Sequence, residues 1–200
     1  TYRATLDEGF TQFLTAWALI DIDGDTLVEQ VPASNYVKKH SSPSLAIYER
    51  VYKSYMRDAI ENNTRQLNTH SDDFNGALHQ GGGYREVYYK TACMLYNLKY
   101  VLGDSLFLAA LQHYFNQWKI AHPYIEDFRN SMIEFTHVDL NWFFDEWIET
   151  TKTIDYSIKS IKKSSTKTEY SIRFKRHEEA QMPIVFTVYS KTHKKSDLHI

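Results

Sequence analysis

Residues 86–118 read EVYYKTACMLYNLKYVLGDSLFLAALQHYFNQW. Apolar side chains recur there at three- and four-residue steps on both sides of Gly103, which favours two amphipathic helices separated by a helix stop. Asp104 follows that glycine and is expected to cap the second helix. The spacing therefore predicts one helix over about 86–102 and another that ends before Pro123.

The same helical periodicity extends through most of the first 150 residues, and it gives way to alternation after them. Further helices are expected at about 6–20, 44–60, 125–135 and 139–150, and a polar loop at 62–83 that ends in Gly81-Gly82-Gly83. Short strands are expected at 154–158, 170–174 and 184–188, as a three-stranded meander. The fold class is thus mainly α: a helical part over 1–150, then the start of an antiparallel β-domain over 151–200 that is incomplete.

Charge marks the same boundary. Residues 1–150 carry 12 Lys and Arg against 20 Asp and Glu, whereas residues 151–200 carry 11 against 5, so the balance changes from −8 to +6. No apolar run approaches the roughly 20 residues of a membrane helix, so no membrane span is expected. The single cysteine, Cys93, excludes an intrachain disulfide framework. The chain begins at Thr1 rather than Met, and we expect it to be a piece of a longer polypeptide.

Two motifs suggest metal sites, and both fail on their spacing. Residues 21–25 (DIDGD) resemble the start of a calcium loop, but Thr26 and Pro32 stand where such a loop needs Gly and a bidentate Glu. A solvated, helix-ending turn is the favoured interpretation. His177-Glu178 begins like the zinc motif HExxH, but Gln181 occupies the position of the second histidine. The lysines of the basic tail lack interleaved aromatic residues, so no nucleic-acid partner is expected.

Two residues are ordinary when each is taken alone. Glu8 lies off the apolar stripe of its helix, near the positive end, where a surface carboxylate is stable. Tyr88 is one of 15 tyrosines, most of which must be packing residues. Neither position indicates chemistry by itself.

Four stretches in register, however, resemble the aminopeptidase N family of zinc peptidases, the gluzincins of peptidase family M1, in its bacterial form. Residues 6–14 (LDEGFTQFL) resemble the family's W-L-N-E-G-F-A segment, and residues 88–92 (YYKTA), followed by Met94-Leu95 and Leu102-Gly103, resemble Y-x-K-G-A…L…L-G. Residues 126–128 (EDF) and 139–147 (DLNWFFDEW) resemble its helical continuation, and residues 153–184 resemble the β-domain that follows. The resemblance covers nearly the whole chain and is weakest at 21–70.

The resemblance implies that residues 1–150 are the helical C-terminal lobe of a gluzincin catalytic domain. It implies one zinc ion in a site of two histidines and one glutamate, in which Glu8 matches the glutamate ligand, with Asp7 at most supporting it. Tyr88 matches the family's catalytic tyrosine, whose hydroxyl donates to the oxyanion that forms on the scissile carbonyl. Thr91 stands where the family usually has Gly, which affects helix packing near Tyr88.

The family's HExxH motif and its G-x-M-E-N segment precede the glutamate ligand, and neither occurs in these 200 residues. The chain alone is therefore expected to hold no zinc and to be inactive, as a fragment of an enzyme that acts on peptide substrates. Two alternatives stay open: a family member that has lost HExxH and serves in binding, or a helical protein-interaction module with an appended β-domain. The sequence preceding Thr1 separates the zinc peptidase from the family member that has lost HExxH. The compartment stays open.

Overall fold

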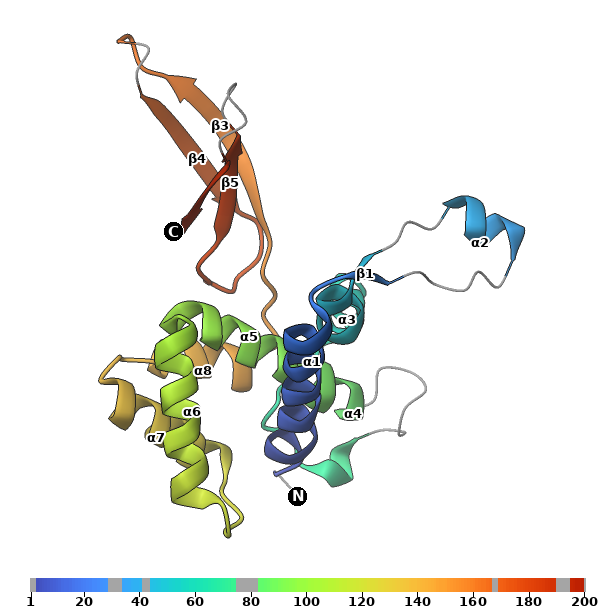
Figure 1. Cartoon of the computed structure of the whole chain (residues 1–200), viewed down its shortest axis with the longest axis vertical. Coiled ribbons are helices and arrows are strands. Elements are labelled where there is room, and N and C mark those ends of the chain that lie inside the picture. Colours follow the sequence, from blue (N-terminus) through green and yellow to red (C-terminus); the bar gives the residue numbers. More distant parts are fainter. Residues whose placement is uncertain are drawn as a thin grey trace. The chain divides into compact units, whose positions relative to one another are not determined.

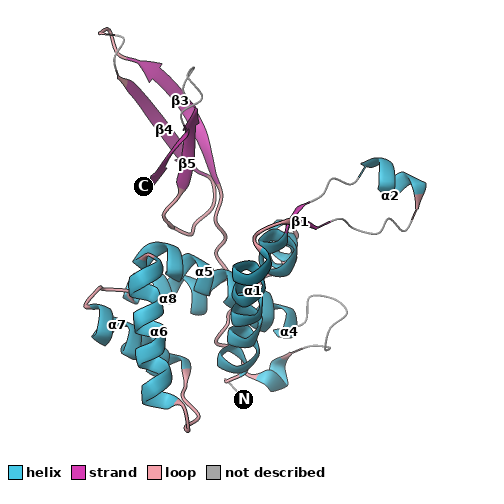
Figure 2. Cartoon of the chain, in the orientation of Figure 1, coloured by secondary structure: helices cyan, strands magenta, loops and turns pink. Residues whose placement is uncertain are grey.

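The computed structural model describes residues 3–28, 34–40, 44–74, 83–166, 169–189 and 195–199 (Figure 1). The chain divides into two compact units, Thr1–Thr151 and Lys152–Ile200. The first unit is built mostly of helices and the second of strands (Figure 2), so the expected fold class, mainly α with an antiparallel β region, is confirmed. Within the described ranges, no helix combines the length and apolar character needed to cross a membrane.

The helical unit contains α-helices interrupted by tighter or wider turns, which are labelled η. Its elements are η1 (Thr5–Gly9), α1 (Phe10–Asp23), β1 (Leu27–Val28), α2 (Asn35–His40), β2 (Ser44–Leu45), η2 (Tyr48–Tyr52), α3 (Lys53–Ile60), η3 (Ser71–Asp73), α4 (Gly83–Arg85), η4 (Glu86–Lys90), α5 (Thr91–Leu102), α6 (Asp104–Trp118), α7 (Ile125–Thr136) and α8 (Asn141–Ile148). The turns η1, η2 and η4 are π-helical, and η3 is a 3₁₀ turn. Helices α4 and α5 flank η4 without a break, so the helix expected at 86–102 begins at Gly83.

The junction between α5 and α6 confirms the expected helix stop. Gly103 has a φ of 77°, a left-handed conformation that glycine adopts without steric cost. The expectation that Asp104 caps α6 is wrong, because Gly103 is the capping residue and Asp104 is the first residue of the helix. The Asp104 carboxylate instead accepts a hydrogen bond of 2.6 Å from Lys99 Nζ, which favours an ion pair over a backbone cap.

The acidic stretch after the first helix connects it to the second helical segment. Helix α1 runs to Asp23, and Gly24, with a φ of 77°, ends it by donating its N–H to the Ile20 carbonyl at 2.9 Å. Asp25 Oδ1 then accepts a hydrogen bond of 2.9 Å from the backbone amide of Ile47, just before η2. The turn that ends α1 therefore also holds the start of η2 through this hydrogen bond. The glycine run expected as a loop lies outside the described residues except for Gly83, which opens α4.

Aromatic side chains form the core of the helical unit. The ring of Phe128 on α7 lies 4.9 Å from the rings of Phe10 and Tyr114 and 5.7 Å from that of Phe144, each in an edge-to-face arrangement. Phe13 on α1 makes similar contacts with Tyr96 and Phe107 on α5 and α6. These pairs join α1, α5, α6, α7 and α8 around one core. Their edge-to-face geometry stabilises the core beyond the contribution of the buried apolar area.

The second unit consists of two antiparallel hairpins. Strand β3 (Tyr156–Lys163) pairs with β4 (Tyr170–Arg176), and β5 (Val185–Tyr189) pairs with β6 (Lys195–His199). The expected three-stranded meander is wrong, because β4 and β5 belong to separate two-stranded sheets and the strand at 195–199 was not anticipated. The rings of Phe174 and Phe186 lie 5.1 Å apart and connect the two hairpins.

A bulge in β3 explains why its apolar residues do not alternate strictly. The register shifts between Ile158 and Ser160, so that Ile158 pairs with Phe174 and Ile161 pairs with Ile172. Phe174 and Ile172 are two residues apart on β4 and share a face. The extra residue in β3 therefore brings Ile158 and Ile161, three positions apart, to that same face.

Candidate functional site

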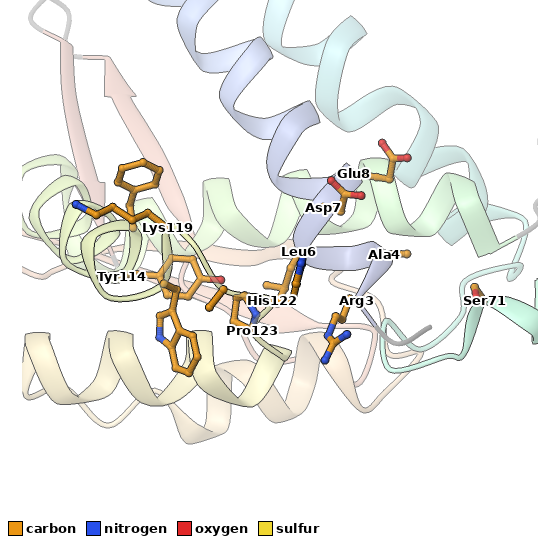
Figure 3. A pocket seen from close by; sticks show the side chains of 13 residues that line it. Arg3, Ala4, Leu6, Asp7, Glu8, Ser71, Tyr114, Lys119, His122 and Pro123 are labelled. Carbon is orange, nitrogen blue, oxygen red and sulfur yellow. The ribbon is translucent and has the colours of Figure 1, made fainter.

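Glu8 lies on the π-helical turn η1, at the N-terminal end of α1. Its side chain is half-buried and borders a cavity of about 570 Å³, which we call the Glu8 cavity. Figure 3 shows Asp7 beside it on the same turn, with Arg3 one turn earlier and Tyr114 and His122 contributed by α6 and the loop after it. The turn thus presents two neighbouring carboxylates to a space that several elements of the helical unit enclose.

The walls of the Glu8 cavity combine cations with aromatic rings. Arg3, Lys119 and His122 supply nitrogen donors, and Tyr114, Phe115 and Trp118 supply rings from one face of α6. The guanidinium of Arg3 also lies over the ring of Tyr124, 4.1 Å from its centroid. Such a lining suits a ligand that has both an apolar part and polar groups.

Tyr88 is the central residue of the π-helical turn η4 and is half-buried. Its ring lies 6.5 Å from that of Tyr89, at an interplanar angle of 44°. The residues that line the Glu8 cavity do not include Tyr88. The structure therefore brings the turns of Glu8 and Tyr88 together without placing both side chains in one cavity.

The contact between the turns η1 and η4 is direct. Gly9, next to Glu8, is buried at this contact, and a Cβ atom built on it would lie 2.5 Å from the carbonyl oxygen of Val87 and still closer to the side chain of Thr91. A side chain at position 9 would push the turns apart. Thr91, where the family motif has Gly, is accommodated because Gly9 faces it.

Glu8 and Tyr88 each lie in a π-helical turn rather than in regular α-helix. A π turn holds one more residue than an α turn, is rare, and occurs often at functional sites. In both places the wider turn continues directly into an α-helix, α1 or α5. The two positions that the family motifs single out thus share an unusual backbone geometry.

Sequence reasoning missed a group of buried charged side chains beside Tyr88. Glu86 and Lys90, at the two ends of η4, are 3% and 1% exposed. Arg85 forms an ion pair of 2.5 Å with the buried Asp58 on α3. Lys90 Nζ donates hydrogen bonds to the carbonyl oxygens of Arg65, at 2.6 Å, and Thr150, at 2.9 Å. Two positive and two negative groups therefore surround the base of the Tyr88 turn.

Burial dominates the electrostatics of this group. It raises the pKa of Glu86 from 4.5 to about 7, although the Lys90 charge opposes the rise and the Asp58 charge adds to it. Among the described residues, no donor reaches hydrogen-bond geometry with the carboxylate oxygens of Glu86. The nearby backbone of Arg65 also acts to lower the pKa of Glu86. Burial lowers the pKa of Lys90 to about 8, and the Glu86 charge limits that decrease.

One sequence signal for this group was available. Glu86 and Lys90 are four residues apart and therefore share a helix face. Their neighbours in the chain, Val87 and Thr91, are both buried, so a charged pair beside them predicts a buried ion pair. Asp58 and Arg65 gave no such signal, because they come from distant segments.

The described residues fit a zinc site only in part. The half-buried carboxylate of Glu8 suits one position of a site with two histidines and one glutamate. Among the residues that the structure describes, no group of three or more His, Cys, Asp and Glu side chains is arranged to hold a metal ion. A complete ligand set would need residues beyond those that the structure describes around Glu8.

A comparison with protein-family models adds a direct finding. The model described as the peptidase family M1 domain matches residues 3–147 of the chain. The matched region includes both Glu8 and Tyr88, and it ends within α8. A search among curated proteins found no match.

Proposed function

Because the chain belongs to peptidase family M1, we propose that it serves in a zinc-dependent aminopeptidase that removes N-terminal residues from peptides. The observation that carries the proposal is the packing of η1 on η4, since it brings the turn of Glu8 against the turn of Tyr88. Gly9 supports it further, because only glycine fits at this contact. The close approach of two π-helical turns is explained if both turns carry residues of one site.

In the proposed reaction the carboxylate of Glu8 would hold the metal. The chemistry that zinc would supply there is activation of a water molecule and polarisation of the scissile carbonyl. The chain's own contribution at this position is a carboxylate on a turn whose neighbour, Gly9, is locked against η4. Such support restricts the movement of the Glu8 carboxylate, and this restriction would make metal binding more favourable.

Tyr88 donates a hydrogen bond through its hydroxyl to the oxygen on which negative charge develops. This donor acts only when charge appears, so it lowers the barrier rather than tightening substrate binding. The half-buried position of Tyr88 leaves the side chain partly accessible while its turn stays fixed by buried neighbours. Peptides are therefore the substrates, and the scissile bond lies near this hydroxyl.

The 200 residues contain no HExxH motif, so the two histidine ligands and the general base of the proposed site would come from elsewhere in a longer polypeptide. We expect the 200-residue chain alone to lose zinc on dialysis and to leave aminoacyl anilides intact. Tight, stoichiometric zinc bound to this chain through Glu8 would overturn the assignment.

The proposal is tested on the complete polypeptide of the reading frame. Glu8→Gln removes the charge and one metal-binding oxygen, so zinc content after dialysis and anilide hydrolysis should both fall to near background. Glu126→Gln is the matched control, since Glu126 is an exposed glutamate on α7, and it should keep both properties. A Glu8→Gln variant with full zinc content and full activity would refute the role of Glu8.

A binding function is the second candidate, and one observation favours it. An apolar groove of about 480 Å³ lies between α1 and α6 and is lined mainly by Phe10, Leu14, Leu108, Leu111, Tyr114 and Phe115. A family member without HExxH would use such a surface to bind a partner rather than to catalyse. The reading frame just before Thr1 decides: HExxH there supports the peptidase, and its absence supports the binding protein.

A further inference from the structure

The turns of Glu8 and Tyr88 are joined through a third piece of the chain, residues 64–68. Thr5 Oγ1, on η1, donates a hydrogen bond of 3.1 Å to the carbonyl oxygen of Leu67. Lys90 Nζ, at the end of η4, donates one of 2.6 Å to the carbonyl oxygen of Arg65. The two acceptors are two residues apart, so one short segment holds both turns.

That segment is itself held in place. Gln66 Nε2 donates to the Glu149 carbonyl at 2.7 Å, and Thr64 Oγ1 donates to the Thr151 carbonyl at 2.9 Å. The side chain of Leu67 is buried. Residues 64–68 therefore form a fixed brace along the C-terminal end of α8, and Lys90 reaches the same end through its second hydrogen bond, to the Thr150 carbonyl.

A buried ammonium group needs a specific reason. An uncompensated buried charge is costly, and an apolar side chain of similar length fills the same volume without that cost. Lys90 recovers part of the cost through its two carbonyl acceptors, and the charge of Glu86 one turn earlier adds to this when that carboxyl is ionised. These contacts therefore add directional constraints on η4 to those of its packing.

We propose that Lys90 is a positioning residue for Tyr88: its buried ammonium ties the π-helical turn to the 64–68 brace, which also holds the turn of Glu8. The inference rests on the proposed function for the catalytic role of Tyr88. Its structural part, that Lys90 sets the position of Tyr88, does not depend on that role. Lys90 itself touches neither substrate nor metal. It acts by setting where the Tyr88 hydroxyl lies relative to Glu8.

The structural part is tested in the 200-residue chain with 3-fluorotyrosine placed at position 88. Lys90→Met removes the hydrogen bonds and nearly keeps the side-chain volume, and it should shift or broaden the fluorine NMR signal of Tyr88. Lys99→Met is the matched control on α5, the helix that continues η4, because Lys99 pairs with Asp104 at the surface. Met132→Ala, a truncation of a buried side chain on α7 rather than on η4 or α5, controls for lost stability.

Circular dichroism checks that each variant is folded at the temperature of the NMR measurement. If Lys90→Met does not fold, Lys90→Arg replaces it, since Arg keeps the charge but displaces the donors, and a smaller shift of the same signal is expected. The proposal is overturned by a Tyr88 signal that stays at its wild-type position in the folded variant, or that moves equally in Met132→Ala.

The kinetic part uses the complete polypeptide and a double-mutant cycle. Lys90→Met should lower kcat about 10- to 100-fold with KM within about twofold, because small displacements of a catalytic group cost this much. Combined with Tyr88→Phe, it should cause no further loss, since a misplaced hydroxyl and a missing one are equivalent. Losses that multiply would show a general structural role and contradict the positioning role. If Tyr88→Phe alone has no effect, the proposed function fails, and the fluorine signal still decides the structural part.

Discussion

The two units of the chain bury their side chains to very different degrees. In the helical unit, the rings of Phe13, Phe107, Phe128, Phe143 and Phe144 are completely buried. Among residues 152–166 and 169–189 of the second unit, the buried apolar side chains are Ala180 and Met182 alone. Strand β3 shows the contrast most clearly, because Ile158 and Ile161 are 54% and 59% exposed although both lie on its apolar face.

The helical unit is the better scaffold for a site that needs exact geometry. Burial of a large apolar side chain contributes about 1.5–3 kcal/mol, so five buried phenylalanine rings provide a rigid frame. Within that frame Glu86 and Lys90 are also buried. Burial of charged groups costs desolvation free energy, which other interactions must offset. The second unit is held mainly by backbone pairing within its hairpins. The proposed chemistry accordingly lies in the unit with the larger buried core.

The largest expected effect tests the frame itself. Phe128→Ala removes a ring that contacts Phe10, Tyr114 and Phe144, and it should lower the free energy of unfolding of the helical unit by about 3–5 kcal/mol. Urea titration followed by circular dichroism measures the loss. A decrease below about 1 kcal/mol would show that the helical unit tolerates cavities and would remove the contrast between the units.

An intermediate effect concerns the buried charges. Folding raises the pKa of Glu86 from 4.5 to about 7, so between these pH values the folded chain keeps a proton that the unfolded chain has released. Stability from this group is fully present below pH 4.5 and decreases as the pH rises towards 7. Lys90, with a pKa of about 8, stays protonated throughout this window.

Relative to Glu86→Gln, the wild-type chain should therefore lose unfolding free energy across that window, on the order of 2 kcal/mol. Urea titrations of both chains at several pH values provide the difference, and comparison with the variant cancels the other titrating groups. A difference that stays flat or grows with pH would mean that Glu86 is ionised in the folded state at neutral pH.

The smallest expected effect lies in the second unit. Ile161 on β3 is mostly exposed, so Ile161→Ala should change stability by no more than about 0.5 kcal/mol. Hydrogen exchange of the β3 amides reports this unit separately from the helices. A tenfold or greater acceleration of exchange would reveal that the apolar face of β3 is covered in solution and that the comparison between the units understates the second one.

The sequence supported the helices and the general position of the strands, because periodicity and glycine stops are local properties. It predicted the Gly103 stop and the change from helix to strand, and the resemblance singled out Glu8 and Tyr88 by motif. It did not predict the hairpin pairing of β5 with β6, since register depends on partners elsewhere in the chain. The bulge between Ile158 and Ser160 also breaks the alternation on which strand prediction relies.

The surroundings of the candidate site depend on distant contacts that no local pattern contains. Lys90 reads as an ordinary helix residue until its acceptors are known, and these come from Arg65 and Thr150. Gly9 is recognised from sequence only as part of a motif. The need for glycine there follows from the close contact with Val87 and Thr91. The π-helical geometry of η1 and η4 likewise has no simple sequence signal.

Tyr88→Phe in the complete polypeptide removes one hydroxyl and little else, so its kinetics decide whether Glu8 and Tyr88 belong to one site. If η1 and η4 carry two parts of one site, kcat should fall about 10²–10³-fold, as expected for loss of one oxyanion donor, with zinc content and KM nearly unchanged. Tyr89→Phe, the same change at the neighbouring tyrosine, is the matched control and should keep full activity. Unchanged kcat in Tyr88→Phe, or loss of zinc together with activity, would contradict the account.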